Sequence, residues 1–195
     1  MGISLQKGAN ISLTRCASGL EAISVGLGWD VRATEGTPFD LDAVVFLLTE
    51  LGDKFKVRND LDMIFYNNLV STCGSVRHMG DNLTGQGDGD DEVIKLNLKT
   101  IPIEVVRIRV GVSIHEAAQR RQNFGMVNSA FIRVVNENDG TEMARYDLSE
   151  EASAETAMIF GEIYLYNGEW KFKAIGQGFA GGLAAMAKDC GVNVD

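Results

Sequence analysis

The segment Ile163-Tyr164-Leu165-Tyr166-Asn167-Gly168-Glu169-Trp170-Lys171-Phe172-Lys173-Ala174-Ile175 decides the fold class of this 195-residue chain. Its two halves are rich in aromatic and β-branched residues, which favour strands. Asn-Gly stands between the halves, and this pair is the preferred centre of a two-residue hairpin turn. The segment therefore predicts two antiparallel strands, residues 163–166 and 170–175.

The remainder of the chain repeats this pattern of short strands and turns, with 22 glycines and only two prolines. We expect residues 3–5 and 11–13 to pair as an opening hairpin, and further strands at residues 22–27, 44–48, 63–66, 93–98, 105–114, 131–135 and 143–148. Residues 116–123 and 183–190 predict short helices. The fold class is therefore mainly β, an antiparallel β-sandwich with a few short helices, in one domain spanning residues 1–195.

The negative charge is concentrated in one third of the chain. Residues 30–92 hold thirteen acidic and five basic side chains, a balance of −8, while the whole chain carries −9. Such a distribution indicates a localised cation site and disfavours nucleic acid as a partner.

Three cysteines, widely spaced and odd in number, predict reduced thiols and a cytoplasmic protein. The first residues lack a secretory pattern, and no apolar run is long enough for a transmembrane segment. We therefore expect neither a secretory signal nor a transmembrane segment.

The acidic third ends in the segment Gly80-Asp81-Asn82-Leu83-Thr84-Gly85-Gln86-Gly87-Asp88-Gly89-Asp90-Asp91-Glu92, with five carboxylates, four glycines and no basic residue. Carboxylates held this close repel one another, so a cation is expected among them. Hard oxygen ligands suit Ca²⁺ or Mg²⁺, and glycine allows backbone carbonyls to turn inward. The alternative is a solvated acidic loop.

Two Asp-x-Asp pairs precede apolar strands, Asp40 with Asp42 and Asp60 with Asp62. Alternation along a strand would place Asp40 and Asp42 on one face. Loops cluster at the ends of a sandwich, so distant acids can meet there. The expected metal ligands are Asp30, Asp40, Asp42, Asp62, Asn67, Asp81, Asn82, Gly87, Asp88, Gly89, Asp90, Asp91 and Glu92. They exceed the six to eight oxygens of one Ca²⁺, which predicts about two ions that share carboxylates.

Standard calcium motifs do not fit the acidic segment. An EF-hand beginning at Asp88 would need glycine where Val93 stands and glutamate where Lys99 stands. The alternative function is a Mg²⁺-dependent enzyme acting on a phosphate or a sugar. No phosphate-binding lysine motif or cluster of bases lies near the acids, so calcium and a non-catalytic role are preferred.

Three other features receive ordinary structural interpretations. Gly176, Gly178 and Gly181 match a dinucleotide fingerprint by spacing, but no second parallel strand follows them. His78 is expected at the surface, and the pair Arg120-Arg121 on a solvated helix face.

Several motifs resemble those of the TerD family of bacterial tellurium-resistance and calcium-binding stress proteins. They are Val25-Gly26-Leu27-Gly28-Trp29-Asp30, Phe39-Asp40-Leu41-Asp42-Ala43, Phe65-Tyr66-Asn67-Asn68, the acidic segment, Arg120-Arg121-Gln122-x-Phe124-Gly125 and Gly168-Glu169-Trp170-Lys171-Phe172. The resemblance covers the chain in order, with Leu83 and Gln86 as departures where a basic residue and Glu are common.

The resemblance implies a cytoplasmic β-sandwich that binds two neighbouring Ca²⁺ ions and serves tellurite resistance and stress tolerance. It also implies protein partners within a resistance or stress complex, for which the membrane surface is one candidate location.

Overall fold

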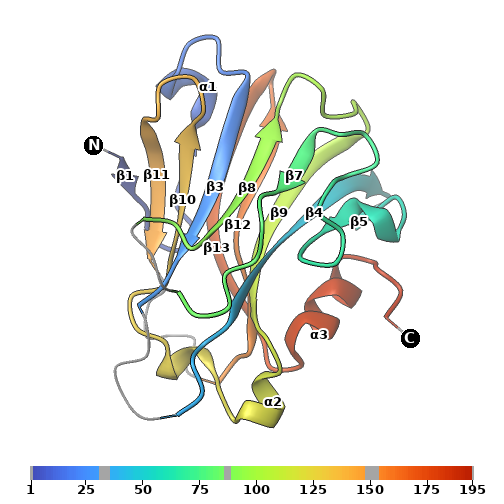
Figure 1. Cartoon of the computed structure of the whole chain (residues 1–195). Coiled ribbons are helices and arrows are strands. Elements are labelled where there is room, and N and C mark those ends of the chain that lie inside the picture. Colours follow the sequence, from blue (N-terminus) through green and yellow to red (C-terminus); the bar gives the residue numbers. More distant parts are fainter. Residues whose placement is uncertain (1, 31–35, 86–88, 148–153, 195) are drawn as a thin grey trace.

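The fold is a sandwich of two β-sheets, seen in a computed structural model that describes residues 2–30, 36–85, 89–147 and 154–194 (Figure 1). The first sheet has the strand order β1 (Ile3–Ser4), β11 (Glu142–Asp147), β10 (Phe131–Asn136), β3 (Ala22–Gly28), β8 (Glu92–Asn97) and β7 (Val76–His78). The second has the order β2 (Asn10–Ser12), β13 (Glu169–Phe179), β12 (Ala157–Tyr166), β9 (Val105–Ile114), β4 (Leu41–Leu51) and β5 (Lys54–Val57), with β6 (Met63–Ile64) also paired to β4. All pairs are antiparallel except β1 with β11.

The helices are short and lie outside the sheets. They are α1 (Leu13–Cys16), α2 (Ala117–Arg120), α3 (Gly182–Asp189) and the 3₁₀ turns η1 (Asp60–Asp62) and η2 (Phe124–Met126). The expected helix over residues 116–123 is shorter than predicted because Arg121 adopts a left-handed conformation, with φ of 53°, and ends it. No helix in the described ranges is both long enough and apolar enough to cross a membrane.

The hairpin that decided the fold class is confirmed. Residues of β12 and β13 pair from Tyr166 with Glu169 through to Ala157 with Phe179. Asn167 and Gly168 both have positive φ, of 51° and 76°, as a type I′ turn requires.

The expected opening hairpin is wrong. β1 pairs with β11 in the first sheet, whereas β2 pairs with β13 in the second. Between them Leu5 is buried in the core, and Gly8 turns the chain with φ of 85°. The segment therefore crosses from one layer to the other.

Strand β4 is buried on both faces. Leu41, Val45 and Leu47 join the core between the sheets, while Val44 and Phe46 face a second apolar cluster. That cluster includes residues of α3, which packs on the outer face of the second sheet (Figure 1). Burial on both faces explains the continuous apolar run of β4 and fixes the strand that begins with the paired aspartates.

Phe160 lies in the core between the sheets, and replacing it tests the packing of that core. Its ring is fully buried and makes edge-to-face contacts with Phe124 and Tyr146, at centroid distances of 6.5 and 5.9 Å. We expect Phe160→Ala to lower the free energy of unfolding by about 3–5 kcal/mol in denaturant titrations, because it leaves a cavity. Leu165→Ala, at a position 43% exposed in the same strand, should cost less than about 1 kcal/mol. Equal losses from the two variants would contradict this description of the core.

Candidate metal centre

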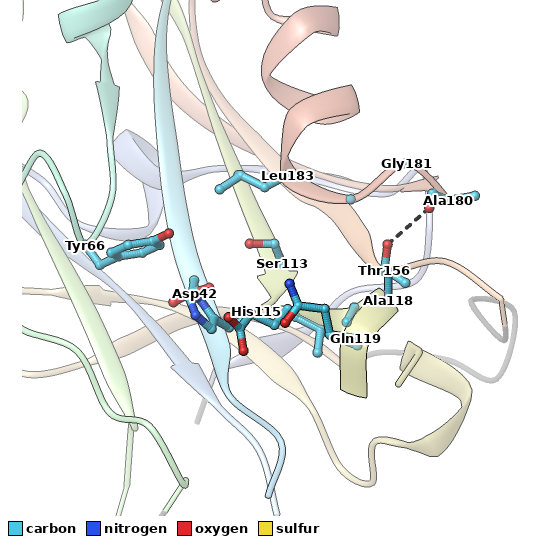
Figure 2. Close-up of a pocket in the computed structure, with 14 residues that line it drawn as sticks. Asp42, Tyr66, Ser113, His115, Ala118, Gln119, Thr156, Ala180, Gly181 and Leu183 are labelled. Carbon is cyan, nitrogen blue, oxygen red and sulfur yellow. Dashed lines mark hydrogen bonds and ion pairs between the residues drawn. The ribbon is translucent and has the colours of Figure 1, made fainter. Parts of the chain in front are cut away.

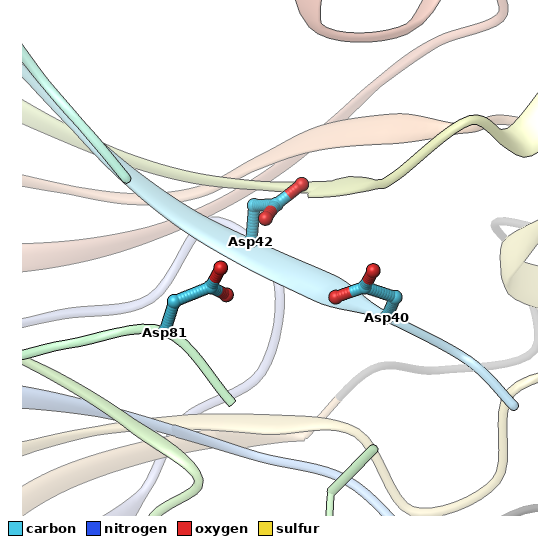
Figure 3. A group of neighbouring side chains, drawn as sticks. All are labelled: Asp40, Asp42 and Asp81. Carbon is cyan, nitrogen blue, oxygen red and sulfur yellow. The ribbon is translucent and has the colours of Figure 1, made fainter. Parts of the chain in front are cut away.

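The start of β4 presents two buried carboxylates side by side. Leu41 points into the core and is fully buried, so the alternating backbone places Asp40 and Asp42 together on the other side, each 4% exposed. Asp81, in the segment after β7, completes the group. One oxygen from each of the three residues lies within 4.8 Å of the others (Figure 3). The predicted juxtaposition of Asp40 and Asp42 is thus present in the structure.

Glu92 ties the acidic segment to the edge of β4. Its carboxylate, at the start of β8, accepts hydrogen bonds from the backbone N–H of Ala43 at 2.6 Å and of Asn82 at 3.3 Å. His78 Nε2 lies 3.5 Å from Glu92 Oε2, and both side chains are fully buried. The expectation that His78 is a surface residue is wrong, because alternation along β7 turns Val76 and His78 inward and Arg77 outward.

Burial and mutual repulsion make these carboxylates hold their protons more strongly than usual. Burial, followed by the charges of Glu92, Asp40 and Asp81, raises the pKa of Asp42 to about 8. Burial also raises the pKa of Asp40, although His115 and Arg120 oppose the shift. The pKa of Glu92 is raised by burial, with His78 opposing. The cost of ionising these carboxylates is therefore high unless another positive charge lies beside them.

Arginines from distant elements pair with two of the acids at this end of the sandwich. Arg120 Nη1 of α2 lies 3.3 Å from Asp40 Oδ2, and Arg133 Nε of β10 lies 2.7 Å from Asp90 Oδ1. The expectation of a solvated helix face is therefore wrong for Arg120. Sequence spacing gave no signal for either contact, since each arginine lies more than forty positions from its partner.

One carboxylate oxygen of the group has no protein partner. Asp40 Oδ1 is buried and accepts no hydrogen bond within the described part of the chain. A buried, unpartnered carboxylate oxygen is costly unless a cation meets it. Two oxygens that share one Ca²⁺ can lie up to about 4.6–5.2 Å apart, twice the usual Ca–O distance, and the three aspartates meet that limit. The donor set and its spacing thus fit a hard divalent cation.

A second group of acids lies around the end of β3. Asp91 Oδ2 accepts a hydrogen bond from the backbone N–H of Trp29 at 2.9 Å, which holds it beside Asp30. Burial raises the pKa of Asp91, and the charges of Asp90 and Asp30 raise it further. Gly26 makes room for this group, because a Cβ atom there would lie 2.0 Å from Asp90 Oδ2.

Asn82 shapes the loop between the two groups of acids. Its Nδ2 donates to Asp91 Oδ1 at 3.1 Å, while its Oδ1 accepts from the backbone N–H groups of Thr84 and Gly85 at 3.2 and 3.1 Å. The side-chain oxygen is thus already engaged by the loop.

Other expected ligands are held elsewhere or are not described. Both oxygens of Asp62 accept from Arg58, at 2.8 Å each, so this carboxylate has its own cation. Asn67 is exposed in a turn after β6, and Asp60, the other member of the second Asp-x-Asp pair, accepts from the backbone N–H of Asn193 at 3.0 Å. Gly89 is exposed near the second group, and Gly87 and Asp88 lie outside the described residues.

A pocket of about 500 Å³ opens beside Asp42, and sequence reasoning missed it (Figure 2). Asp42 and Ser113, which are paired across β4 and β9, form its floor. His115 and Tyr66 flank Asp42, with His115 Nδ1 3.6 Å from Asp42 Oδ2. The residues come from five separate segments, so no sequence spacing could reveal the pocket.

This combination of a two-sheet sandwich with buried acids at one strand edge defines the class of protein, an all-β domain with a candidate cation site. The TerD domain model matches residues 1–190. The chain is 58% identical over 193 residues to the tellurium resistance protein TerD of Serratia marcescens, covering 99% of each. It is 51% identical over 195 residues to general stress protein 16U of Bacillus subtilis (strain 168), covering 100% of each.

The chain therefore belongs to the TerD family, a family of tellurium-resistance and stress-response proteins. A solved homologue of telluride resistance protein (TerD) from Streptomyces coelicolor A3(2) has the same fold, with a TM-score of 0.70 at 23% identity. That match covers 87% of this chain and 96% of the homologue.

Asp42 makes the stability of the metal-free protein depend on pH. Its pKa of about 8 in the folded state exceeds the ordinary value of 3.8, so the folded state binds more protons between these values. This contribution is fully present below about pH 4 and is lost as the pH rises through about 8. We expect the melting temperature in chelator to fall more between pH 5.5 and pH 8 for the natural protein than for Asp42→Asn, by calorimetry. If the melting temperatures of the two proteins changed equally with pH, the raised pKa would not belong to Asp42.

Proposed function

We propose that this TerD-family protein binds calcium at Asp40, Asp42 and Asp81. The observation that carries the proposal is the buried, unpartnered Oδ1 atom of Asp40 within a group of three carboxylates whose oxygens lie within 4.8 Å. An ion there supplies the missing partner and cancels the mutual repulsion.

A second ion is proposed at the group formed by Asp30, Asp90 and Asp91, which gives about two ions in total. The raised pKa of Asp91 supports this, because neighbouring acids cause part of the shift. Glu92 and Asn82 connect the two groups through hydrogen bonds to Ala43 and Asp91. Gly87, Asp88 and Gly89 stay among the expected ligands, without assignment to either ion.

The proposed role is binding and signalling rather than catalysis. Calcium would order the loops at this end of the sandwich and create a surface for protein partners of a stress or resistance complex, including partners at the membrane surface. The three free cysteines support a cytoplasmic location. A Mg²⁺-dependent enzyme remains the alternative, and turnover of generic phosphoesters that Asp42→Asn abolishes would favour it.

Replacing Asp42 by Asn separates the ion's contribution from the fold's own stability. In the natural protein, a hundredfold excess of Ca²⁺ over Kd should stabilise the folded state by about 2.7 kcal/mol. In Asp42→Asn this calcium effect should be largely lost. In chelator at pH 8, however, the variant should melt above the natural protein, because a buried charge and its repulsion are gone.

Asp53→Asn is the matched control, since Asp53 is exposed in the turn between β4 and β5. It makes the same change of charge outside the site and should keep the full calcium effect. A calcium effect that survives in Asp42→Asn, or vanishes in Asp53→Asn, would refute the proposed ligand set.

A further inference from the structure

We propose that the pocket beside Asp42 binds a small oxyanion, a carboxylate or a tetrahedral oxyanion, one oxygen of which joins the ion held by Asp42. The inference rests on the proposed calcium site and extends it from an ion site to a paired site for an ion and an anion. The pocket's volume of about 500 Å³ falls within the range that small-molecule sites occupy.

The first observation is an unused hydroxyl at the floor of the pocket. Ser113 is only 2% exposed and lines the pocket, and its side chain makes no hydrogen bond to any residue that the structure describes. Figure 2 shows Ser113 between Asp42 and Leu183. The hydroxyl lines the pocket, where it can donate a hydrogen bond to a ligand oxygen.

The second observation is the start of α3. Gly181, Gly182 and Leu183 line the pocket opposite α2, and the N-cap residue Gly181 has no side chain to satisfy the first N–H groups. This eight-residue helix thus presents unpaired N–H donors and the positive end of its dipole. Both features favour an anion near Ser113.

Two acids line the pocket, and their repulsion of an anion is lessened by the ion proposed at Asp42 and by Arg120, which Glu116 shares with Asp40. Asp42 serves the proposed ion. The Glu116 carboxylate lies 3.5 Å from Arg120 Nη2. The hydroxyl of Thr156 already donates to the Ala180 carbonyl at 3.2 Å. What remains for a ligand is the start of α3, the Ser113 hydroxyl and the ion that we propose at Asp42.

An ion and an anion that touch must help each other bind. If the anion raises the affinity for the ion by some factor, the ion raises the affinity for the anion by the same factor. We expect at least about fivefold coupling, the lower end of the common range. Calcium would thereby make the pocket selective for anions, although the acids alone would repel them.

Terbium luminescence tests the inference, because Tb³⁺ substitutes for Ca²⁺ and its decay in H₂O and D₂O counts bound waters. We expect acetate or sulfate to displace one or two waters from protein-bound terbium, in a saturable manner, and to tighten terbium binding. An effect of acetate alone identifies a carboxylate, and an effect of sulfate identifies a tetrahedral oxyanion. If terbium binds but neither anion alters its waters or affinity, the inference is wrong while the ion site stands. If terbium does not bind, the ion site and the inference both fall.

Gln119→Glu locates the anion in this pocket. Gln119 is exposed on α2 and lines the pocket, so the change adds a negative charge without altering size. We expect it to weaken the anion effect several-fold and to leave terbium binding in the absence of anion intact. The control Gln6→Glu, at an exposed position outside the pocket, should leave the anion effect unchanged. Equal behaviour of the two variants, or displacement of waters by methylammonium instead of by the anions, would overturn the inference.

Discussion

The burial of three carboxylates at one strand edge is the constraint on which the acidic end of this molecule depends. Asp40, Asp42 and Glu92 are each 4% exposed or less. Oxygens of Asp40, Asp42 and the exposed Asp81 lie within 4.8 Å of one another, and two unit charges at that distance repel by on the order of 3 kcal/mol at an effective dielectric constant near 20. Protonation relieves the repulsion by removing the negative charge of a carboxylate, as the raised pKa of Asp42 indicates. A bound cation relieves it with all carboxylates ionised.

The two sheets hold the carboxylates in this position because the strands that carry them cannot move independently. β4 is buried on both faces, and β8 is paired with β3 and β7. Glu92 joins the two sheets by accepting from the backbone of Ala43. The site is therefore assembled by the sandwich rather than by one continuous loop, which explains why the segment matches no EF-hand.

The sequence predicted those structural features that depend on residues close together in the chain. The Asn167-Gly168 turn was predictable because both residues readily adopt positive φ, and Asp40 with Asp42 because a strand alternates. The same Asp-x-Asp spacing at residues 60–62 gave a wrong prediction. The backbone there forms the 3₁₀ turn η1 instead of an extended strand, and Asp62 forms an ion pair with Arg58. The opening hairpin failed for a related reason, because local pattern does not say which sheet a strand joins. His78 was within reach, since its alternation with Arg77 along β7 marks it as buried. The pairing of Arg120 with Asp40 could not be predicted, because the two residues lie 80 positions apart in the sequence.

Membership of the TerD family places this chain among tellurium-resistance and stress-response proteins, while the proposed chemistry rests on the residues themselves. Calorimetric titration of the metal-stripped protein with calcium is the most direct test of the central claim. We expect saturable binding heat with a stoichiometry of about two calcium ions per chain. The absence of binding heat at millimolar calcium, from a protein whose fold is intact by circular dichroism, would contradict it.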